Sequence, residues 1–143
     1  HARPGAECRH NLTYWRYGDY AGIGPGAHGR LTIDGAKLAT RQHRAPEAWL
    51  AAVESAGHAT RQCDEISPGD RLTEMTLMGM RLRAGIQRER LLEETGQTIE
   101  AAYDRARLAR LVDGGFLVLD DDGLRATATG LQRLNAVIGE LIA

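Results

Sequence analysis

The sequence predicts an α+β fold in which short strands precede a helical domain. Three observations support this class. Apolar residues recur at helical spacing through most of the chain after residue 45. Asp-Gly pairs at residues 34–35 and 122–123 lie between apolar or β-branched segments, which is typical of hairpins. The first 45 residues are rich in glycine and lack a helical period. We therefore divide the chain into residues 1–45, 46–66 and 67–143.

We expect strands in the first segment. Residues 12–24 combine aromatic and β-branched side chains without a helix cap, which favours one or two short strands. The glycines around Pro25 exclude a helix there and permit positive φ. Residues 30–33 and 36–40 should pair as a hairpin. The second segment should be a connecting helix and linker, with Pro46 in its first turn and Gly57 ending the helix in the left-handed conformation.

The third segment has the element order of a winged helix. Ser67 is suited to cap a helix that carries Leu72 and Met75 and ends by Gly85. A short helix over residues 88–95 and a helix capped by Thr98 should follow. The stretch over residues 116–130 should form the wing as a hairpin around Asp122-Gly123, and Thr129 should cap the last helix. Because these apolar stripes can bury one another, we expect residues 67–143 to fold independently.

Composition narrows the function classes. The 143 residues carry a net charge of −1, so no general attraction to nucleic acid or to an anionic membrane is implied. No apolar run reaches the length of a membrane span, and no signal segment opens the chain. Two cysteines, Cys8 and Cys63, make neither a disulfide framework nor a four-ligand zinc site. We expect a cytoplasmic protein without a nucleic-acid partner.

Two further patterns allow more than one function. The stretch GIGPGAHG could cradle a phosphate, but it lacks the Gly-Lys-Ser/Thr ending; a tight turn, or a backbone passing close to a bulky ligand, are the alternatives. The helix before the wing carries Arg105, Arg107 and Arg110, which could contact DNA. Glu100 and the acidic wing tip oppose that reading, so a solvated, ion-paired face is favoured.

At residues 8–31 the sequence reads CRHNLTYWRYGDYAGIGPGAHGRL, which closely resembles the C-x-H-N-x-x-Y-W and G-x-G-x-G-A-H segment of HemW-type radical SAM proteins. These are heme chaperones related to oxygen-independent coproporphyrinogen III oxidases. Residues 74–86 resemble the family pattern ending in G-L-R-L-x-x-G-I, with Met80 in place of a leucine. Residues 115–138 resemble its closing helix.

The resemblance implies a heme-binding motif made of His10, Asn11, Tyr14 and Trp15. In it, His10 would ligate the heme iron, Asn11 would fix the imidazole tautomer, and the two rings would contact the macrocycle. A glycine loop made of Gly22, Gly24, Gly26 and His28 would lie next to the cofactor or the porphyrin. Gly29 stands where the family usually has a serine.

The resemblance also implies that residues 1–45 are the last strands of a truncated radical SAM barrel. The iron–sulfur cluster of the family needs a C-x3-C-x2-C motif, which this sequence lacks, so the cluster and S-adenosylmethionine belong to an intact parent and this chain alone should be inactive. The implied function is heme binding and delivery to acceptor proteins. A coproporphyrinogen III oxidase is the alternative, and the winged-helix DNA binder is a third. Strands without their barrel neighbours could also pair two copies of the chain.

Overall fold

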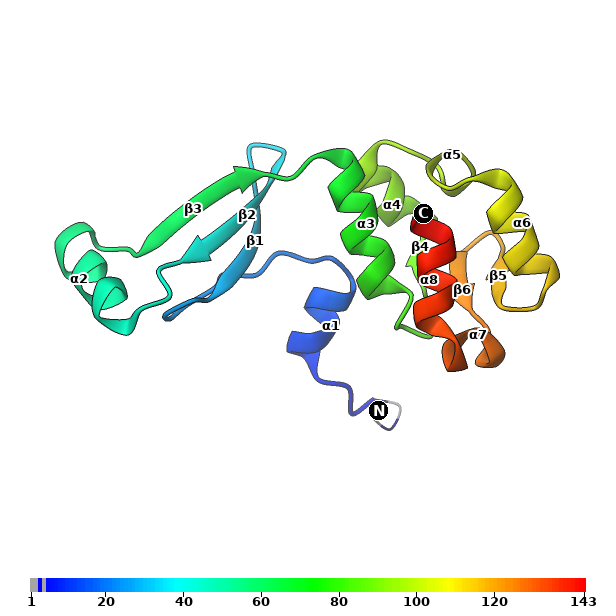
Figure 1. Cartoon of the computed structure of the whole chain (residues 1–143), viewed down its shortest axis with the longest axis horizontal. Coiled ribbons are helices and arrows are strands. Elements are labelled where there is room, and N and C mark those ends of the chain that lie inside the picture. Colours follow the sequence, from blue (N-terminus) through cyan, green and yellow to red (C-terminus); the bar gives the residue numbers. More distant parts are fainter. Residues whose placement is uncertain (1–2, 4) are drawn as a thin grey trace. The chain divides into compact units, whose positions relative to one another are not determined.

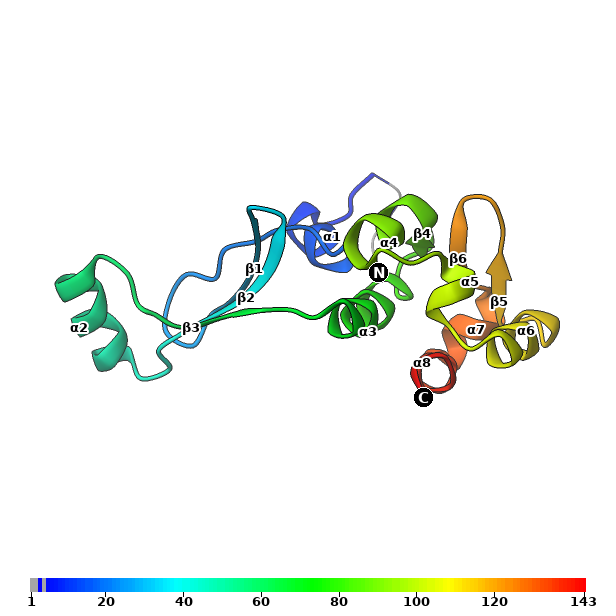
Figure 2. The ribbon, with the colours of Figure 1, turned by 90° about the horizontal axis from the view of Figure 1, so that it is seen from above.

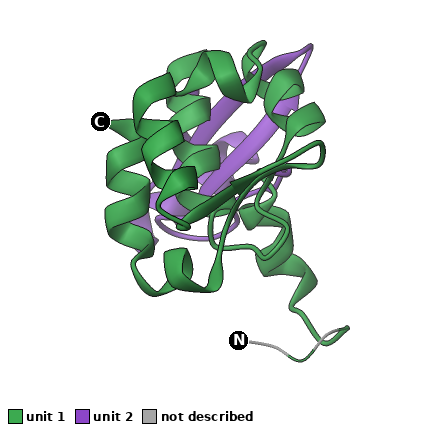
Figure 3. Cartoon of the chain, turned by 90° about the vertical axis from the view of Figure 1, so that its right-hand side faces the viewer, with its two compact units in different colours: residues 1–17, 67–143 green, residues 18–66 purple. Residues whose placement is uncertain are grey.

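The computed structural model describes residue 3 and residues 5–143. The chain forms two compact units (Figure 3). The helical unit combines the N-terminal residues up to Tyr17 with residues 67–143, and the sheet unit comprises residues 18–66. The predicted boundary after residue 66 coincides with a boundary between the units. The one after residue 45 does not, because strands on both sides of it pair in one sheet. Residues 1, 2 and 4 of the predicted first segment lie outside the described residues.

The sheet unit contains an antiparallel meander, β1 (His28–Ile33), β2 (Ala36–Gln42) and β3 (Thr60–Glu65), in the order β1-β2-β3 (Figure 1). The predicted hairpin is confirmed, with Ile33 opposite Ala36 and positive φ at both turn residues between them. Helix α2 (Pro46–Ala56) begins at the predicted proline, and Gly57 ends it with a φ of 77°. Strand β3, which lies in the predicted linker, was not anticipated.

A carboxylate ties the segment before β1 to the hairpin. Asp19 accepts hydrogen bonds from the Thr32 amide at 2.7 Å and from the Thr32 hydroxyl at 2.9 Å, and Lys37 Nζ lies 2.8 Å from its Oδ1. Burial raises the pKa of Asp19, but the bonds from Lys37 and Thr32 outweigh burial and lower it on balance. The extended segment that follows adds one bridge, between Tyr20 and Arg30.

The helical unit begins with α1 (Arg9–Trp15), in a region where the sequence predicted strands. That prediction is wrong for residues 12–15. Local pairs one turn apart support the helix, because the Thr13 hydroxyl donates to the Arg9 carbonyl and Tyr14 contacts His10. The ring of Tyr17, which follows α1, belongs to the hydrophobic core of this unit. Tertiary burial of this kind overrides the weak local propensity.

The rest of the helical unit follows the predicted winged-helix order, and its α+β class is confirmed (Figure 2). Its elements are α3 (Pro68–Gly79), β4 (Ile86–Gln87), α4 (Arg88–Thr95), α5 (Ile99–Ala102), α6 (Arg105–Asp113), β5 (Leu117–Leu119), β6 (Gly123–Ala126), α7 (Ala128–Gln132) and α8 (Leu134–Ile142). The wing is a three-stranded antiparallel sheet in the order β4-β6-β5.

Three helix boundaries differ from the predicted ones. Helix α3 begins at the predicted Ser67 cap but ends at Gly79, and Gly85 instead takes a φ of 67° against the wing backbone. The helix expected from Thr98 is two helices, because Tyr103 is extended and Asp104 starts α6 by accepting from the Arg107 amide at 2.8 Å. The helix expected from Thr129 is also two helices: Thr127 caps α7, and α8 follows from Arg133 without a side-chain cap.

The core of the helical unit includes side chains from its helices and from the three strands of the wing. Its buried members are Tyr17, Met75, Met80, Ile86, Leu91, Ile99, Tyr103, Leu108, Leu111, Leu117, Leu124, Val137, Ile138 and Leu141. One buried polar contact lies among them, where the hydroxyl oxygens of Thr76 and Tyr103 are 2.7 Å apart. Buried polar groups are therefore paired where they enter this core, as stability requires.

Candidate functional site

All four residues of the predicted binding motif lie on α1. The hydroxyl of Tyr14 is 2.5 Å from Nε2 of His10, and the two rings meet edge to face with centroids 4.4 Å apart at 85°. His10 and Asn11 are exposed, Tyr14 is half-buried, and Trp15 is 36% exposed. Four positions on a two-turn helix therefore present an imidazole, an amide, a phenol and an indole at the surface.

The hydrogen bond between Tyr14 and His10 bears on the roles expected from the sequence. Asn11 was expected to fix the imidazole tautomer, but among the described residues the amide of Asn11 makes no hydrogen bond. The hydroxyl of Tyr14 instead contacts Nε2 of the imidazole, and the two rings meet edge to face. The role expected of Asn11 stays a prediction; in a helix, side chains four residues apart meet and adjacent ones do not, which favours contact of His10 with Tyr14.

The chemistry of these residues fits heme. Imidazole and phenolate oxygen are both established ligands of heme iron. The exposed indole of Trp15 can cover part of a flat apolar ring. In the structure Nε2 of His10 is engaged by Tyr14, so binding iron through Nε2 requires the Tyr14 hydroxyl to move aside.

The glycine loop of the predicted site lies in the sheet unit, and α1 lies in the helical unit. The structure therefore does not bring the two parts together within one compact unit. Close packing within the sheet unit accounts for glycine at position 22, because a Cβ there would lie 2.4 Å from the carbonyl oxygen of His28. Gly24 and Gly26 have positive φ, and a Cβ at Gly24 would meet open space. His28 itself opens β1.

Gly29, the departure from the family serine, is also crowded. A Cβ at this position would lie 2.5 Å from Oγ1 of Thr40 on the paired strand. Real Cβ atoms do not approach other atoms so closely, so a serine here would require Thr40 to shift. Close approach of the chain to itself is thus sufficient to explain Gly22 and Gly29.

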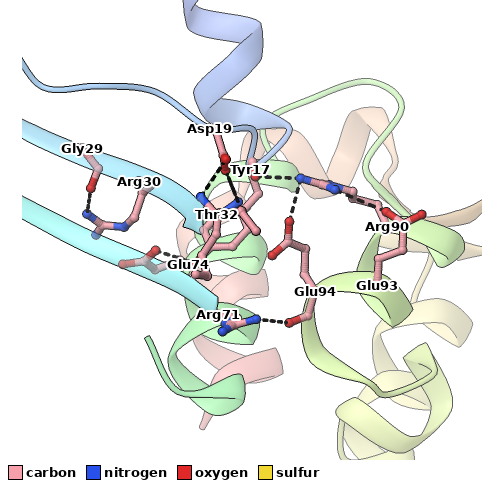
Figure 4. A network of polar contacts seen from close by, with 11 residues as sticks. Tyr17, Asp19, Gly29, Arg30, Thr32, Arg71, Glu74, Arg90, Glu93 and Glu94 are labelled. Carbon is pink, nitrogen blue, oxygen red and sulfur yellow. Dashed lines mark hydrogen bonds and ion pairs between the residues drawn. The ribbon is translucent and has the colours of Figure 1, made fainter. Parts of the chain in front are cut away.

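Sequence reasoning missed a polar cluster below α1. Tyr17, Glu74, Arg90 and Glu94 form a connected network within the helical unit (Figure 4). Glu74 lies in the segment singled out by family resemblance, but no sequence pattern joined it to Tyr17, which is 57 positions earlier. An aromatic residue two positions after the motif was the available signal.

Other candidate features have structural explanations. Arg110 forms an ion pair with Glu140 of α8, with Nη2 2.5 Å from Oε1, and Arg107 Nη1 lies 3.5 Å from the Glu140 carbonyl oxygen. Two of the three arginines that could contact DNA are thus engaged with α8. Across residue 3 and residues 5–143, no group of three His, Cys, Asp or Glu residues could hold a metal ion. The thiols of Cys8 and Cys63 are both free and exposed.

About half of the chain matches a known family of protein domains. Residues 66–133 match the family model of the HemN C-terminal domain. The fold agrees, since the coproporphyrinogen III oxidase HemN of Escherichia coli, a radical SAM enzyme, superposes with a TM-score of 0.58 at 17% identity, covering 97% of this chain and 34% of that one. No helix in the described part of the chain is long and apolar enough to cross a membrane.

The chain carries a HemN C-terminal domain and is similar in sequence to HemW-type proteins over nearly its full length. It is 32% identical over 139 residues to the heme chaperone HemW of Escherichia coli, covering 96% of this chain and 35% of that protein. It is 35% identical over 147 residues to the mitochondrial radical S-adenosyl methionine domain-containing protein 1 of Mus musculus, covering 99% of this chain and 33% of that protein. The chain thus spans about a third of the length of these relatives.

Proposed function

We propose that this chain is part of a HemW-like protein of heme metabolism that binds heme on α1 and passes it to acceptor proteins. The observation that carries the proposal is the exposed His10–Tyr14 pair with Trp15 on the same short helix. The name of the Escherichia coli relative, a heme chaperone, supports it. Exposure suits a carrier, because heme held at a surface can be released to a second protein without unfolding the first.

In this proposal His10 is the iron ligand and Trp15 contributes stacking area. Tyr14 holds the imidazole until heme arrives and then leaves Nε2 to the iron. The iron–sulfur cluster and S-adenosylmethionine are assigned to the rest of such a protein, since this sequence has two cysteines and a cubane cluster takes three or four thiolates. We place the protein in the cytoplasm, although the Mus musculus relative is named as mitochondrial.

Heme titration of the chain and its variants tests the proposal. His10→Ala should shift or weaken the Soret band and raise Kd by about 10- to 100-fold, equivalent to about 1.4–2.8 kcal/mol. Trp15→Ala should raise Kd while leaving the band position nearly unchanged. His43→Ala, outside the motif, is the control. An unchanged spectrum for His10→Ala, with a fall in Tm, would show that His10 only supports the fold.

Tyr14→Phe separates the two possible ligands in the motif. If His10 is the ligand, removing the hydroxyl frees Nε2, so the imidazole signature in the spectrum should persist and Kd should not rise. Loss of the ferric-heme ligand signature in Tyr14→Phe, with its retention in His10→Ala, would assign the iron to the phenolate of Tyr14 instead.

A coproporphyrinogen III oxidase is the second candidate, because the HemN fold matches 97% of this chain. The H-N-x-x-Y-W motif favours the chaperone. Anaerobic assay of a full-length parent with S-adenosylmethionine discriminates between them: decarboxylation of coproporphyrinogen would support the oxidase, and heme binding without decarboxylation would support the chaperone.

A further inference from the structure

We propose that Glu74 and Arg90, through Tyr17, are positioning residues for the α1 motif, so that the HemN C-terminal domain forms the rigid support of the heme-binding surface. This inference rests on the proposed function, because it assigns a purpose to the support of α1. It concerns contacts within the helical unit alone.

Tyr17 occupies an unusual position for a large side chain. It is the residue after the C-cap of α1 and has a φ of 58°, in the left-handed region where helices usually place glycine. A glycine is available one position later, at residue 18, yet the tyrosine takes the strained conformation. Its ring is 2% exposed and belongs to the hydrophobic core. Strain that persists at a defined position indicates that the buried ring is needed there.

The C-terminal domain contacts both the side-chain hydroxyl and the backbone carbonyl of Tyr17 (Figure 4). Its hydroxyl donates to Oε2 of Glu74 on α3 at 2.8 Å, and its carbonyl oxygen accepts from Nη2 of Arg90 on α4 at 3.1 Å. Arg90 is itself fixed by the buried Glu94, whose Oε1 lies 2.6 Å from the same nitrogen. Arg71 Nη1 lies 3.3 Å from the Glu94 carbonyl oxygen. The residue is therefore clamped by charged partners from two helices.

The clamp reaches the motif directly. The amide of Tyr17 donates to the carbonyl of Tyr14 at 3.0 Å, so the last turn of α1, with Tyr14 and Trp15, is closed by the clamped residue. Helix α1 has seven residues, none of them buried, and it lies beside α3, which carries Glu74. A helix of this length is not stable alone. Without Tyr17, α1 and the His10–Tyr14 pair on it lose their main anchor.

Trp15 provides a readout on α1 itself. The sequence has two tryptophans, and Trp49→Phe leaves Trp15 as the single indole; that substitution is mild, because Nε1 of Trp49 makes no hydrogen bond among the described residues. In this background, Tyr17→Phe and Glu74→Gln should both increase the amplitude of the fast phase in the fluorescence anisotropy decay of Trp15, which reports local motion of the indole. Tyr17→Gly, which permits the same φ but removes the ring, should increase it most.

Heme binding should follow the same order. We expect Tyr17→Phe and Glu74→Gln to raise the heme Kd by about 3- to 10-fold, which is only part of the effect of losing a hydrogen bond to a charged group, because this bond acts on heme only through α1. Glu93→Gln is the matched control: Glu93 pairs with Arg90 at 3.3 Å from an exposed position and does not touch Tyr17, so neither readout should change.

The outcomes separate this inference from the proposed function. Unsubstituted chain that binds no heme would overturn the proposed function, and the support of heme binding with it. Heme binding that Tyr17→Phe and Glu74→Gln leave unchanged, together with an unchanged Trp15 anisotropy, would overturn only the inference. A lower Tm in these variants without any change at Trp15 would also overturn it, because the contacts would then stabilise the core and not α1.

Discussion

Each of the two units of this chain is stabilised internally by a different kind of interaction. The helical unit has a continuous core that joins its helices to the wing. Within residues 18–66, the buried apolar residues are Ala59 and Ile66, whereas Ile23 is 86% exposed and Leu50 is 51% exposed. The sheet unit depends instead on strand pairing and on the bonds made by Asp19. The helical unit is therefore stabilised mainly by buried apolar side chains, and the sheet unit mainly by hydrogen bonds between backbone segments and to Asp19.

The largest contrast should come from removing a leucine in each unit. Leu91→Ala empties a fully buried position of the helical core and should cost about 2–5 kcal/mol of unfolding free energy. Leu50→Ala, on the exposed face of α2, should change it by no more than about 0.5 kcal/mol. Urea unfolding followed by circular dichroism measures both. Similar costs for the two variants would show that Leu50 is buried in solution and would remove the contrast.

Alkaline pH should weaken the helical unit through one residue. Burial raises the pKa of Tyr103 to about 12, despite the opposing bond to Thr76, whereas an unfolded tyrosine ionises near pH 10. Its contribution to stability is complete below pH 10 and is lost as the pH rises from 10 to 12, by about 3 kcal/mol in total.

Unfolding midpoints measured across this pH range test the prediction for Tyr103. Tyr103→Phe is the control, because it keeps the ring and removes the ionisable hydroxyl, so much of the alkaline loss should disappear. An identical alkaline loss in the variant would assign the effect to other groups.

A backbone substitution should reveal the dependence of the sheet unit on close approach. Gly22→Ala brings a Cβ to 2.4 Å from the His28 carbonyl oxygen, so the extended segment must move away from β1, at a cost of about 1–3 kcal/mol to local opening. Hydrogen exchange should then show faster exchange of the Tyr20 and Arg30 amides, which bond across this segment.

Gly139→Ala is the control for the backbone substitution. Its Cβ meets open space on α8, so it should leave exchange in the sheet unit unchanged and should stabilise α8 slightly. Unaltered exchange at Tyr20 and Arg30 in Gly22→Ala would mean that the segment is not packed as the structure has it.

The elements that could be predicted from the sequence are those with local signals. The turn at Asp34-Gly35, the Ser67 cap and the left-handed Gly57 were all read correctly, because each depends on a few adjacent residues. Strand β3 was missed because five of its six residues are exposed, so its sequence lacks the alternation of apolar and polar residues that marks a strand. Helix α1 was missed because its anchor, Tyr17, bonds to a residue 57 positions away.

The candidate site shows the same division. The identities of His10, Asn11, Tyr14 and Trp15 came from family resemblance, and their roles remain predictions. The pairing of His10 with Tyr14 could be foreseen only by assigning a helix, since a strand would place the two side chains on the same face but out of direct contact. The predicted independence of residues 67–143 likewise omitted Tyr17, which contributes to their core.

The two exposed thiols are sites at which labels can be attached to measure a distance between the two units. Cys8 immediately precedes α1 in the helical unit, and Cys63 lies on β3 in the sheet unit. One spin label on each would give a single distance between the units, without any substitution in the sequence. Recorded with and without added heme, that distance would test whether the heme binding proposed above changes the separation of the two units.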